Sequence, residues 1–134
     1  MESCIFCKII KGKIPCTKIY EDKNVLAFLD ISPVNKGHAL VMPKKHFDTL
    51  MDVPDDLLCE AMKIVKKLSK AVMKAVKADG INISINNYKA AGQLVPHLHV
   101  HIIPRFKDDS LKLDWPTKKD SEMEKTAEQI RKAL

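Results

Sequence analysis

The most regular pattern of apolar positions in the chain lies between Leu57 and Val76 and has the period of an α-helix. Apolar residues recur there every three or four positions, and lysines fill half of the positions between them. This spacing predicts one long amphipathic helix with a wide buried face. Asp52 lies where an N-cap belongs, Pro54 suits a first turn, and Gly80 provides a stop.

Shorter segments on either side of this helix have the character of β-strands and are separated by polar turns. Strands are predicted at 17–21, 25–30, 38–42, 81–86 and 97–103, and shorter helices at 4–11 and 121–134. This order favours an α+β fold with a mainly antiparallel sheet over a repeating βαβ fold. No repeat or boundary divides the chain, so we expect one domain, with a core at about 4–106 and a C-terminal extension at about 107–134.

Composition narrows the class of protein further. A chain of 134 residues with 46% hydrophobic and 30% charged residues is typical of a soluble globular domain. No apolar run approaches the ~18–20 residues that span a bilayer, and no signal peptide is present, so we expect a cytoplasmic protein with no membrane partner. The formal charge of +6 favours anionic partners. The lysines are dispersed and aromatic residues make up only 5%, so no specific nucleic-acid partner is predicted.

The most informative stretch is the predicted strand that contains His97, His99 and His101. Alternate residues of a strand share one face, so the three imidazoles are expected on one side and the intervening apolar residues on the other. Three of the five histidines of the chain fall within five positions. Imidazole is a common metal ligand, and it can also attack an electrophile and leave again near neutral pH. A metal site and a covalent-transfer site are both consistent with this pattern.

Other polar residues are expected near this strand. Gly92 allows a close backbone approach, Gln93 supplies amide donors and an acceptor, Asn86 ends the preceding strand, and His38 begins an earlier one. Donors of this kind can hold phosphate oxygens. The sequence contains no Walker-type loop and no GxGxxG, so a bound nucleotide would use neither motif.

The run from His97 to Ile103 resembles the signature of the histidine triad (HIT) family, in particular its Hint-type branch and the short prokaryotic-style members. Further matching segments follow in order along nearly the whole chain to about Arg105, at 5–10, 14–15, 20–22, 26–31, 37–38, 43–46, 86–87 and 92–93. The resemblance implies an antiparallel sheet of about five strands with one long helix, a homodimer, and no organic cofactor. It also implies a purine nucleotide, such as an AMP or GMP derivative, as the partner.

The resemblance further implies a reaction. His99 would attack the α-phosphorus of a nucleoside 5′-phosphoramidate, and water would release the monophosphate from a nucleotidyl–histidine intermediate. His101, His38, Asn86 and Gln93 would hold or act on the phosphate. A carboxylate is a natural acceptor for the two ribose hydroxyls, and this is the role expected of Asp30; the alternative is that Asp30 caps a loop. Apolar walls of the purine pocket, which would otherwise be ordinary core, are expected from Ile5, Phe6, Ile9, Phe28 and Ile31.

Two other functions stay open at this point. The first is hydrolysis of dinucleoside polyphosphates, which predicts a second nucleotide groove near Lys89, Arg105 or Lys107. The second is a nucleotide-binding or scaffold protein with weak catalysis. Many Hint-type members have Ser or Thr after the Gly-Gln pair, whereas this chain has Leu94, which removes a proton donor near the leaving group.

A second site is indicated by Cys4 and Cys7, whose Cys-x₂-Cys spacing is half of a tetrahedral zinc site. His46 and His97 are the candidates for the other two ligands, and the resemblance implies the same four. With all four positions filled, the zinc would be structural and would anchor His97. Two alternatives are unligated buried thiols and a catalytic zinc held by the triad. Neither Cys16 nor Cys59 is expected to have a special role.

Overall fold

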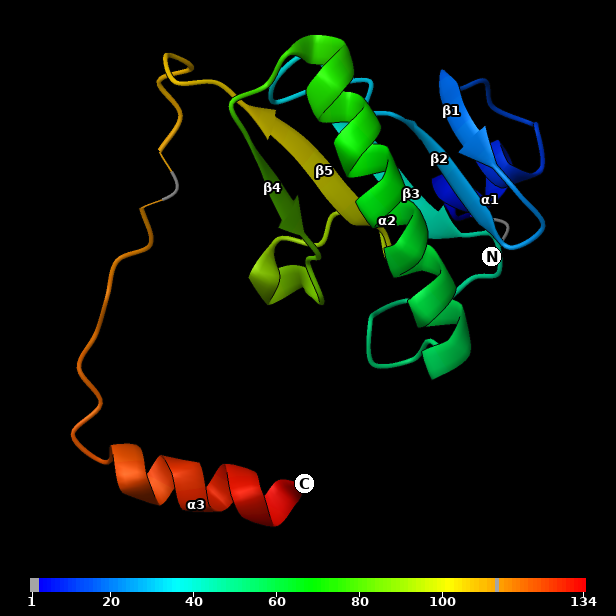
Figure 1. The fold of residues 1–134 in the computed structure, drawn as a ribbon. Coiled ribbons are helices and arrows are strands. Elements are labelled where there is room, and N and C mark those ends of the chain that lie inside the picture. Colours follow the sequence, from blue (N-terminus) through cyan, green and yellow to red (C-terminus); the bar gives the residue numbers. More distant parts are fainter. Residues whose placement is uncertain (1–2, 113) are drawn as a thin grey trace.

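The computed structural model describes residues 3–112 and 114–134. Its centre is a five-stranded antiparallel sheet in the order β1-β2-β3-β5-β4 (Figure 1). The α+β class predicted from the sequence is confirmed. The elements are α1 (Ile5–Ile10), β1 (Lys18–Glu21), β2 (Val25–Leu29), β3 (Ala39–Pro43), α2 (Asp55–Val76), β4 (Gly80–Ser84), a short 3₁₀ turn η1 (Lys89–Ala91), β5 (Val100–Arg105) and α3 (Met123–Ala133).

The central strands are buried on both faces, and each face has its own helix. On β2, Val25 and Ala27 pack toward α2, in a core cluster that includes Val65 and Leu68. Successive strand residues point to opposite faces. The intervening residues of β2, with Leu40 and Met42 of β3, therefore pack on the other face, against Phe6 and the two cysteines of α1. Because both faces are covered, these strands are continuous apolar runs in the sequence.

The long helix forms where its periodicity predicts, but both of its predicted end signals are wrong. It begins at Asp55 with Pro54 as N-cap, and the negative charges of two aspartates in its first turn interact favourably with the positive end of the helix dipole. Asp52 instead accepts hydrogen bonds from the backbone N–H and hydroxyl of Thr49. The helix ends before Lys77, which adopts a left-handed conformation, and Gly80 begins β4.

The strand of the triad is displaced from its predicted bounds. It begins at Val100 rather than His97, because the backbone N–H of Leu98 donates to Phe47 in a loop and not to a neighbouring strand. It also continues past its predicted end at residue 103, through Pro104 to Arg105. β3 pairs with β5 only from Val100 to Ile102, so Pro104 has a strand partner on one side alone and its missing N–H breaks no ladder.

The C-terminal segment is separate from the sheet. The predicted helix at 121–134 forms as α3, whose residues are all at least partly exposed and which lies apart from the other elements in Figure 1. Among the described residues, no helix combines the length and the apolar character needed to cross a membrane.

Candidate functional site

A cavity with a volume of about 880 Å³ lies on the α1 face of the sheet. Its apolar wall comes from α1, the segment before β1, and β2. Its polar wall includes Asp30 after β2, Asn86 after β4, and His99 and His101 on the β5 side. The structure therefore brings most of the predicted nucleotide-site residues together around one cavity, namely Ile5, Phe6, Ile9, Phe28, Asp30, Ile31, Asn86, His99 and His101.

The position of the proton on the His99 ring is fixed by a backbone carbonyl two residues earlier in the chain. Its Nδ1 lies 2.7 Å from the carbonyl oxygen of His97, which can only accept, so Nδ1 carries the proton. In the neutral ring Nε2 then has the free lone pair. Burial lowers the pKa of His99 below its ordinary value, so the ring is neutral near pH 7. The imidazole thus meets two requirements of a nucleophile, a neutral ring and an available lone pair.

A second backbone group orients the neighbouring pair of imidazoles. The N–H of Val34 donates to Nδ1 of His38 at 3.0 Å, so the proton of His38 lies on Nε2. That Nε2–H donates to Nδ1 of His101 at 2.9 Å, which leaves His101 with its own proton on Nε2. Burial, followed by the neighbouring His99 and His38, lowers the pKa of His101 to about 4. His38 therefore lies behind His101 and acts on the cavity through it.

The carboxylate of Asp30 has two different environments. Its Oδ1 accepts the backbone N–H of Ser32 at 2.8 Å, which fits the loop-capping alternative. Its Oδ2 lies 3.6 Å from Nε2 of His38, beyond ordinary hydrogen-bond length, and the residue lines the cavity. One oxygen therefore stabilises the loop, while the other is available to a ligand.

The structure places Gln93 away from the cavity wall. The side chain is buried, its Oε1 accepts the backbone N–H of Tyr88 at 2.8 Å, and its Nε2 donates to the carbonyl of Asp48 at 2.6 Å. Both ends of the amide thus hold protein backbone. These bonds close the loop between β4 and β5, in which Tyr88 has a positive φ of 70°.

Several residues of the cavity wall were not predicted from the sequence. They come from the segment between α1 and β1, from β3, and from the segment before β5: Ile14, Pro15, Cys16, Thr17, Leu40 and Val95. Cys16 was expected to have no special role. Its position here follows from the way the segment folds back beside α1, and no local pattern marks it. Arg105, one of the residues considered for a second nucleotide groove, is instead held by Asp109 and Asn82.

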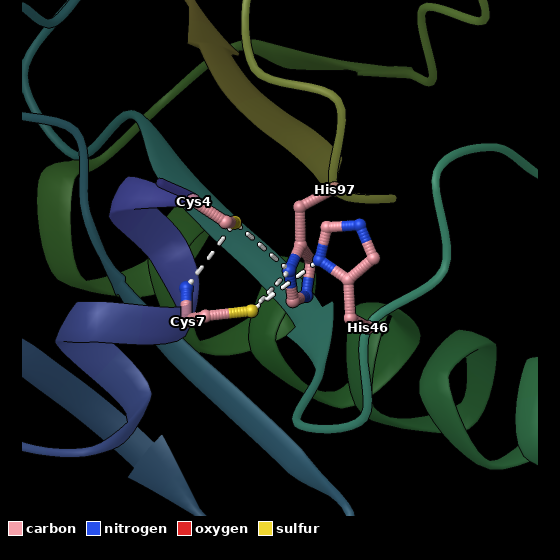
Figure 2. Close-up of side chains that lie close together, drawn as sticks. All are labelled: Cys4, Cys7, His46 and His97. Atoms are coloured by element: carbon pink, nitrogen blue, oxygen red, sulfur yellow. Dashed lines mark hydrogen bonds between the residues drawn. The ribbon is translucent and has the colours of Figure 1, made fainter. Parts of the chain in front are cut away.

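The four residues of the predicted metal site converge beside the cavity (Figure 2). Nδ1 of His97 lies 3.5 Å from Sγ of Cys4 and 3.6 Å from Sγ of Cys7, and Nδ1 of His46 lies 3.3 Å from Sγ of Cys7. A tetrahedral zinc with ordinary bond lengths separates neighbouring sulfur and nitrogen ligands by about 3.5 Å. The donor set and its spacing therefore fit this metal.

The outer nitrogens of the same two histidines are also bonded in the way a metal site requires. Nε2 of His97 donates to the carbonyl of Pro43 at 2.8 Å, and Nε2 of His46 donates to Asp48 at 2.7 Å. Each ring therefore directs an unprotonated Nδ1 toward the thiols, and such outer partners are typical of histidine ligands. Burial lowers the pKa of His97 to about 4, which keeps Nδ1 available.

A second group of potential ligands, Asp30, His38 and His101, fits a metal poorly although its atoms are close together. A metal on Nε2 of His38 would move the ring proton to Nδ1. There it would face the N–H of Val34, which already donates to that nitrogen. The hydrogen-bond pattern therefore favours a proton over a metal ion between His38 and His101.

Comparison with known proteins confirms the predicted family. The family model of the HIT domain matches residues 11–108, and the chain belongs to the HIT family. An adenosine 5′-monophosphoramidase of Saccharomyces cerevisiae is 49% identical, over 85% of this chain and 70% of the yeast protein.

Solved structures agree with this assignment. A HIT family protein of Bacillus subtilis superposes with a TM-score of 0.90 at 42% identity, covering 98% of this chain and 97% of that one. A zinc-bound HIT protein of Mycobacterium smegmatis superposes with a TM-score of 0.79 at 36% identity, covering 99% of each chain.

Proposed function

We propose that this protein hydrolyses nucleoside 5′-phosphoramidates to the nucleoside monophosphate and an amine, with His99 as the nucleophile. The observation that carries the proposal is the hydrogen bond from Nδ1 of His99 to the carbonyl of His97, which leaves Nε2 unprotonated on a residue of the cavity wall. The name of the yeast relative, an adenosine 5′-monophosphoramidase, supports the same class of substrate.

The reaction takes place in two displacements. In the first, the lone pair on Nε2 of His99 forms a bond to phosphorus, the P–N bond breaks with its electrons going to nitrogen, and the amine leaves with a proton from solvent water. In the second, the oxygen of a water molecule forms a bond to phosphorus, the P–Nε2 bond breaks with its electrons returning to Nε2, and a proton of that water is released to solvent. Splitting one displacement into two lowers each barrier. The Nε2–H of His101 is placed to donate to a phosphate oxygen as charge develops there.

The two sides of the cavity suit the two halves of a nucleoside. The apolar wall, with Phe6, Phe28 and Ile31, suits a purine ring, because aromatic and branched side chains bury the faces of the base. Oδ2 of Asp30, which lies 3.6 Å from Nε2 of His38 on a residue that lines the cavity, would accept hydrogen bonds from the ribose hydroxyls.

The charge of the cavity favours a single phosphate. The chain has a formal charge of +6, yet the residues that line the cavity include no Lys or Arg. A dinucleoside polyphosphate places several negative charges in a row, which proteins usually neutralise with Lys, Arg or a metal ion. We therefore keep polyphosphate hydrolysis as the second candidate. A nucleotide-binding protein with weak catalysis is the third candidate. Measured turnover of the two kinds of substrate distinguishes the three candidates.

The test is release of AMP from adenosine 5′-phosphoramidate and from diadenosine tetraphosphate, with the wild type and His99→Ala. We expect faster turnover of the phosphoramidate, loss of at least about 10³-fold in the variant, and one adenylate group on the wild-type protein by mass spectrometry after acid quench. Faster cleavage of the tetraphosphate would favour the second candidate. If the protein binds AMP but shows no turnover that depends on His99, the third candidate would be favoured.

We propose further that Cys4, Cys7, His46 and His97 hold a structural zinc ion. When bound, the ion would cross-link α1 to the segments before β5 and after β3, and it would fix the backbone of His97, whose carbonyl orients His99. The test is metal content by mass spectrometry. One zinc per chain is expected in the wild type and in Cys59→Ser, whose cysteine is exposed, and none in Cys7→Ser. Equal zinc in both variants would contradict the proposal.

We propose that two copies of the chain associate through β4. This strand is an edge of the sheet, and Ile83 on it is exposed. A groove of about 420 Å³ lies between β4 and α2 and is lined by five apolar side chains together with Lys66, Ser69 and Lys70. An antiparallel edge can pair with itself about a two-fold axis. Sedimentation equilibrium is expected to give a dimer for the wild type and a monomer for Ile83→Lys. A wild-type monomer would contradict the proposal.

A further inference from the structure

The outer side of α2 carries one kind of side chain only. After Glu60 the helix has no acidic residue, and its exposed charged residues are five lysines: Lys63, Lys66, Lys67, Lys70 and Lys74. At about 100° per residue, the five fall within an arc of about 100° that is centred opposite the buried residues of the helix. Every position of α2 in that arc after Glu60 is a lysine. We call these five residues the lysine face.

The charge of the lysine face is not neutralised by the rest of the described chain. An acidic residue four positions from a lysine stabilises a helix, whereas a second lysine there destabilises it. Three pairs within the lysine face are four positions apart. No Asp or Glu that the structure describes forms a salt bridge with any of the five lysines. An anion from outside the chain is therefore the partner that would relieve this repulsion.

The lysine face has the shape of a ridge. In Figure 1, α2 crosses one face of the sheet, while α1 and the cavity lie on the other. Lys66 lines the groove beside β4, and Lys67 lies over the ring of Tyr20 on β1 at 5.6 Å from its centre. These two lysines are thus on opposite flanks of the ridge, and the other three lie between them.

A ridge that is positive on both flanks suits a groove with negative charge on both walls. An α-helix with its side chains is about 10–12 Å across, and the major groove of B-form DNA is about 12 Å wide. Phosphates border that groove on both sides. The distance from Lys63 to Lys74 along the helix axis is about 17 Å, so several phosphates of each strand are within reach.

Other polyanions and acidic partners suit the lysine face less well. Protein interfaces are depleted of lysine and rich in aromatic residues and arginine. Proteins that bind single strands stack bases on aromatic side chains, and helices that lie on membranes bury Trp, Phe or Leu. The lysine face has none of these residues. The major groove of duplex RNA is too narrow and deep for such a ridge.

We propose that the lysine face binds duplex DNA through its phosphates, without preference for base sequence. Lysine contacts phosphate as a point charge, and the arginine, asparagine and glutamine side chains that read base edges are absent from the face. The proposal is independent of the proposed hydrolysis, because the cavity lies on the opposite face of the sheet.

The experiment measures binding of the full chain to a fluorescently labelled 24-base-pair DNA duplex, by anisotropy, between 25 and 150 mM NaCl. Five phosphate contacts predict a slope of log K against log salt of about −4.5, with a Kd of about 10⁻⁵ M at 150 mM. The variant Lys63→Gln/Lys70→Gln/Lys74→Gln should lower the slope to about −2 and weaken binding at least about tenfold. Glutamine keeps the helix, since its helix propensity equals that of lysine.

The matched control removes the same charge elsewhere. Lys112, Lys118 and Lys119 are exposed and lie outside α2, in the segment before α3. Changing these three to glutamine should leave the slope and the affinity within about twofold of wild type, because none of them contacts the DNA.

Four results would overturn the proposal. They are no binding of duplex DNA at 25 mM NaCl, an equal loss in the two triple variants, a wild-type slope near zero, and tighter binding to duplex RNA, single-stranded DNA or phosphatidylserine vesicles than to duplex DNA. If the α2 triple variant loses the wild-type circular dichroism spectrum, the single variants Lys63→Gln and Lys70→Gln replace it. Each should reduce the slope by about 1, and an unchanged slope in both would equally overturn the proposal.

Discussion

The amide of Gln93 offers a sharp test of how the loop beside the cavity is held. Replacing it with glutamate keeps the shape and the oxygen that accepts from Tyr88. The second oxygen would then lie where Nε2 lies now, 2.6 Å from the carbonyl of Asp48, with no hydrogen between two acceptors. The new carboxyl can restore this contact by remaining protonated, since its O–H then donates to the carbonyl.

The cost of that proton sets the magnitude. A glutamate in the unfolded chain has a pKa near 4.3, so keeping it protonated in the folded state costs about 1.36 kcal/mol for each pH unit above that value. Gln93→Glu should therefore lower the free energy of unfolding by ~4 kcal/mol at pH 7 and by ~1 kcal/mol at pH 5. The sign is that of a raised pKa: the folded variant binds more protons, so it loses stability relative to wild type as the pH rises.

The assay is urea unfolding of wild type and variant at pH 5, 6 and 7. Subtracting the wild-type value at each pH removes the titration of every other group. Gln129→Glu is the matched control, because that side chain is exposed on α3 and should change the stability by less than about 0.5 kcal/mol. Equal stability of Gln93→Glu and wild type at pH 7, or a loss that does not vary with pH, would refute the assignment of these two hydrogen bonds.

Three further predictions concern the cavity. Asp30→Ala should abolish the preference for adenosine over 2′-deoxyadenosine phosphoramidate, about tenfold in kcat/KM, if its Oδ2 accepts from the ribose; an unchanged preference would assign the carboxylate to the loop alone. The pKa of His101 is lowered to about 4 by burial and by His99 and His38, with Asp30 acting in the opposite direction. The contribution of His101 to the free energy of unfolding is therefore complete above pH 6.5 and is lost as the pH falls toward 4. On acidification over this range, His101→Gln should lose up to about 3 kcal/mol less stability than the wild type, as measured by urea unfolding. Phe6→Leu should lower kcat about fivefold, because the ring of Phe6 meets that of His99 edge to face at 5.0 Å and helps orient it; a change in KM alone would contradict this.

Much of the fold follows from the sequence because its elements obey local periodicity. The recurrence of apolar residues predicts α2, and the alternation of histidine with apolar residues predicts that one face of the triad segment is core. The histidine face holds in the structure even before the strand begins at Val100, because the rings of His97 and His99 both meet the ring of Phe6 edge to face. The ends of the elements are less predictable. Asp52 is a good N-cap residue, yet its carboxylate bonds to Thr49 instead.

The family and the types of the chemical groups were also determined by the sequence. The spacing of Cys4 and Cys7 indicates a metal site, and the histidine run indicates the HIT family, which the comparison confirms. These signals are local, since each depends on a few residues at fixed spacing. Gln93 shows their limit. The residue type suits a phosphate contact, but whether its amide faces a ligand or the backbone depends on where Asp48 lies, 45 residues away along the chain.

Only the tertiary structure decided what each imidazole can do. The histidines of the triad segment have equivalent side chains in the sequence. In the fold, Nε2 of His97 donates to the carbonyl of Pro43, Nδ1 of His99 donates to the carbonyl of His97, and Nδ1 of His101 accepts from His38. These partners fix where each proton lies, and so fix which nitrogen faces the thiols and which faces the cavity. Two of these three partners, Pro43 and His38, come from segments distant along the chain, and periodicity carries no information about contacts between such segments.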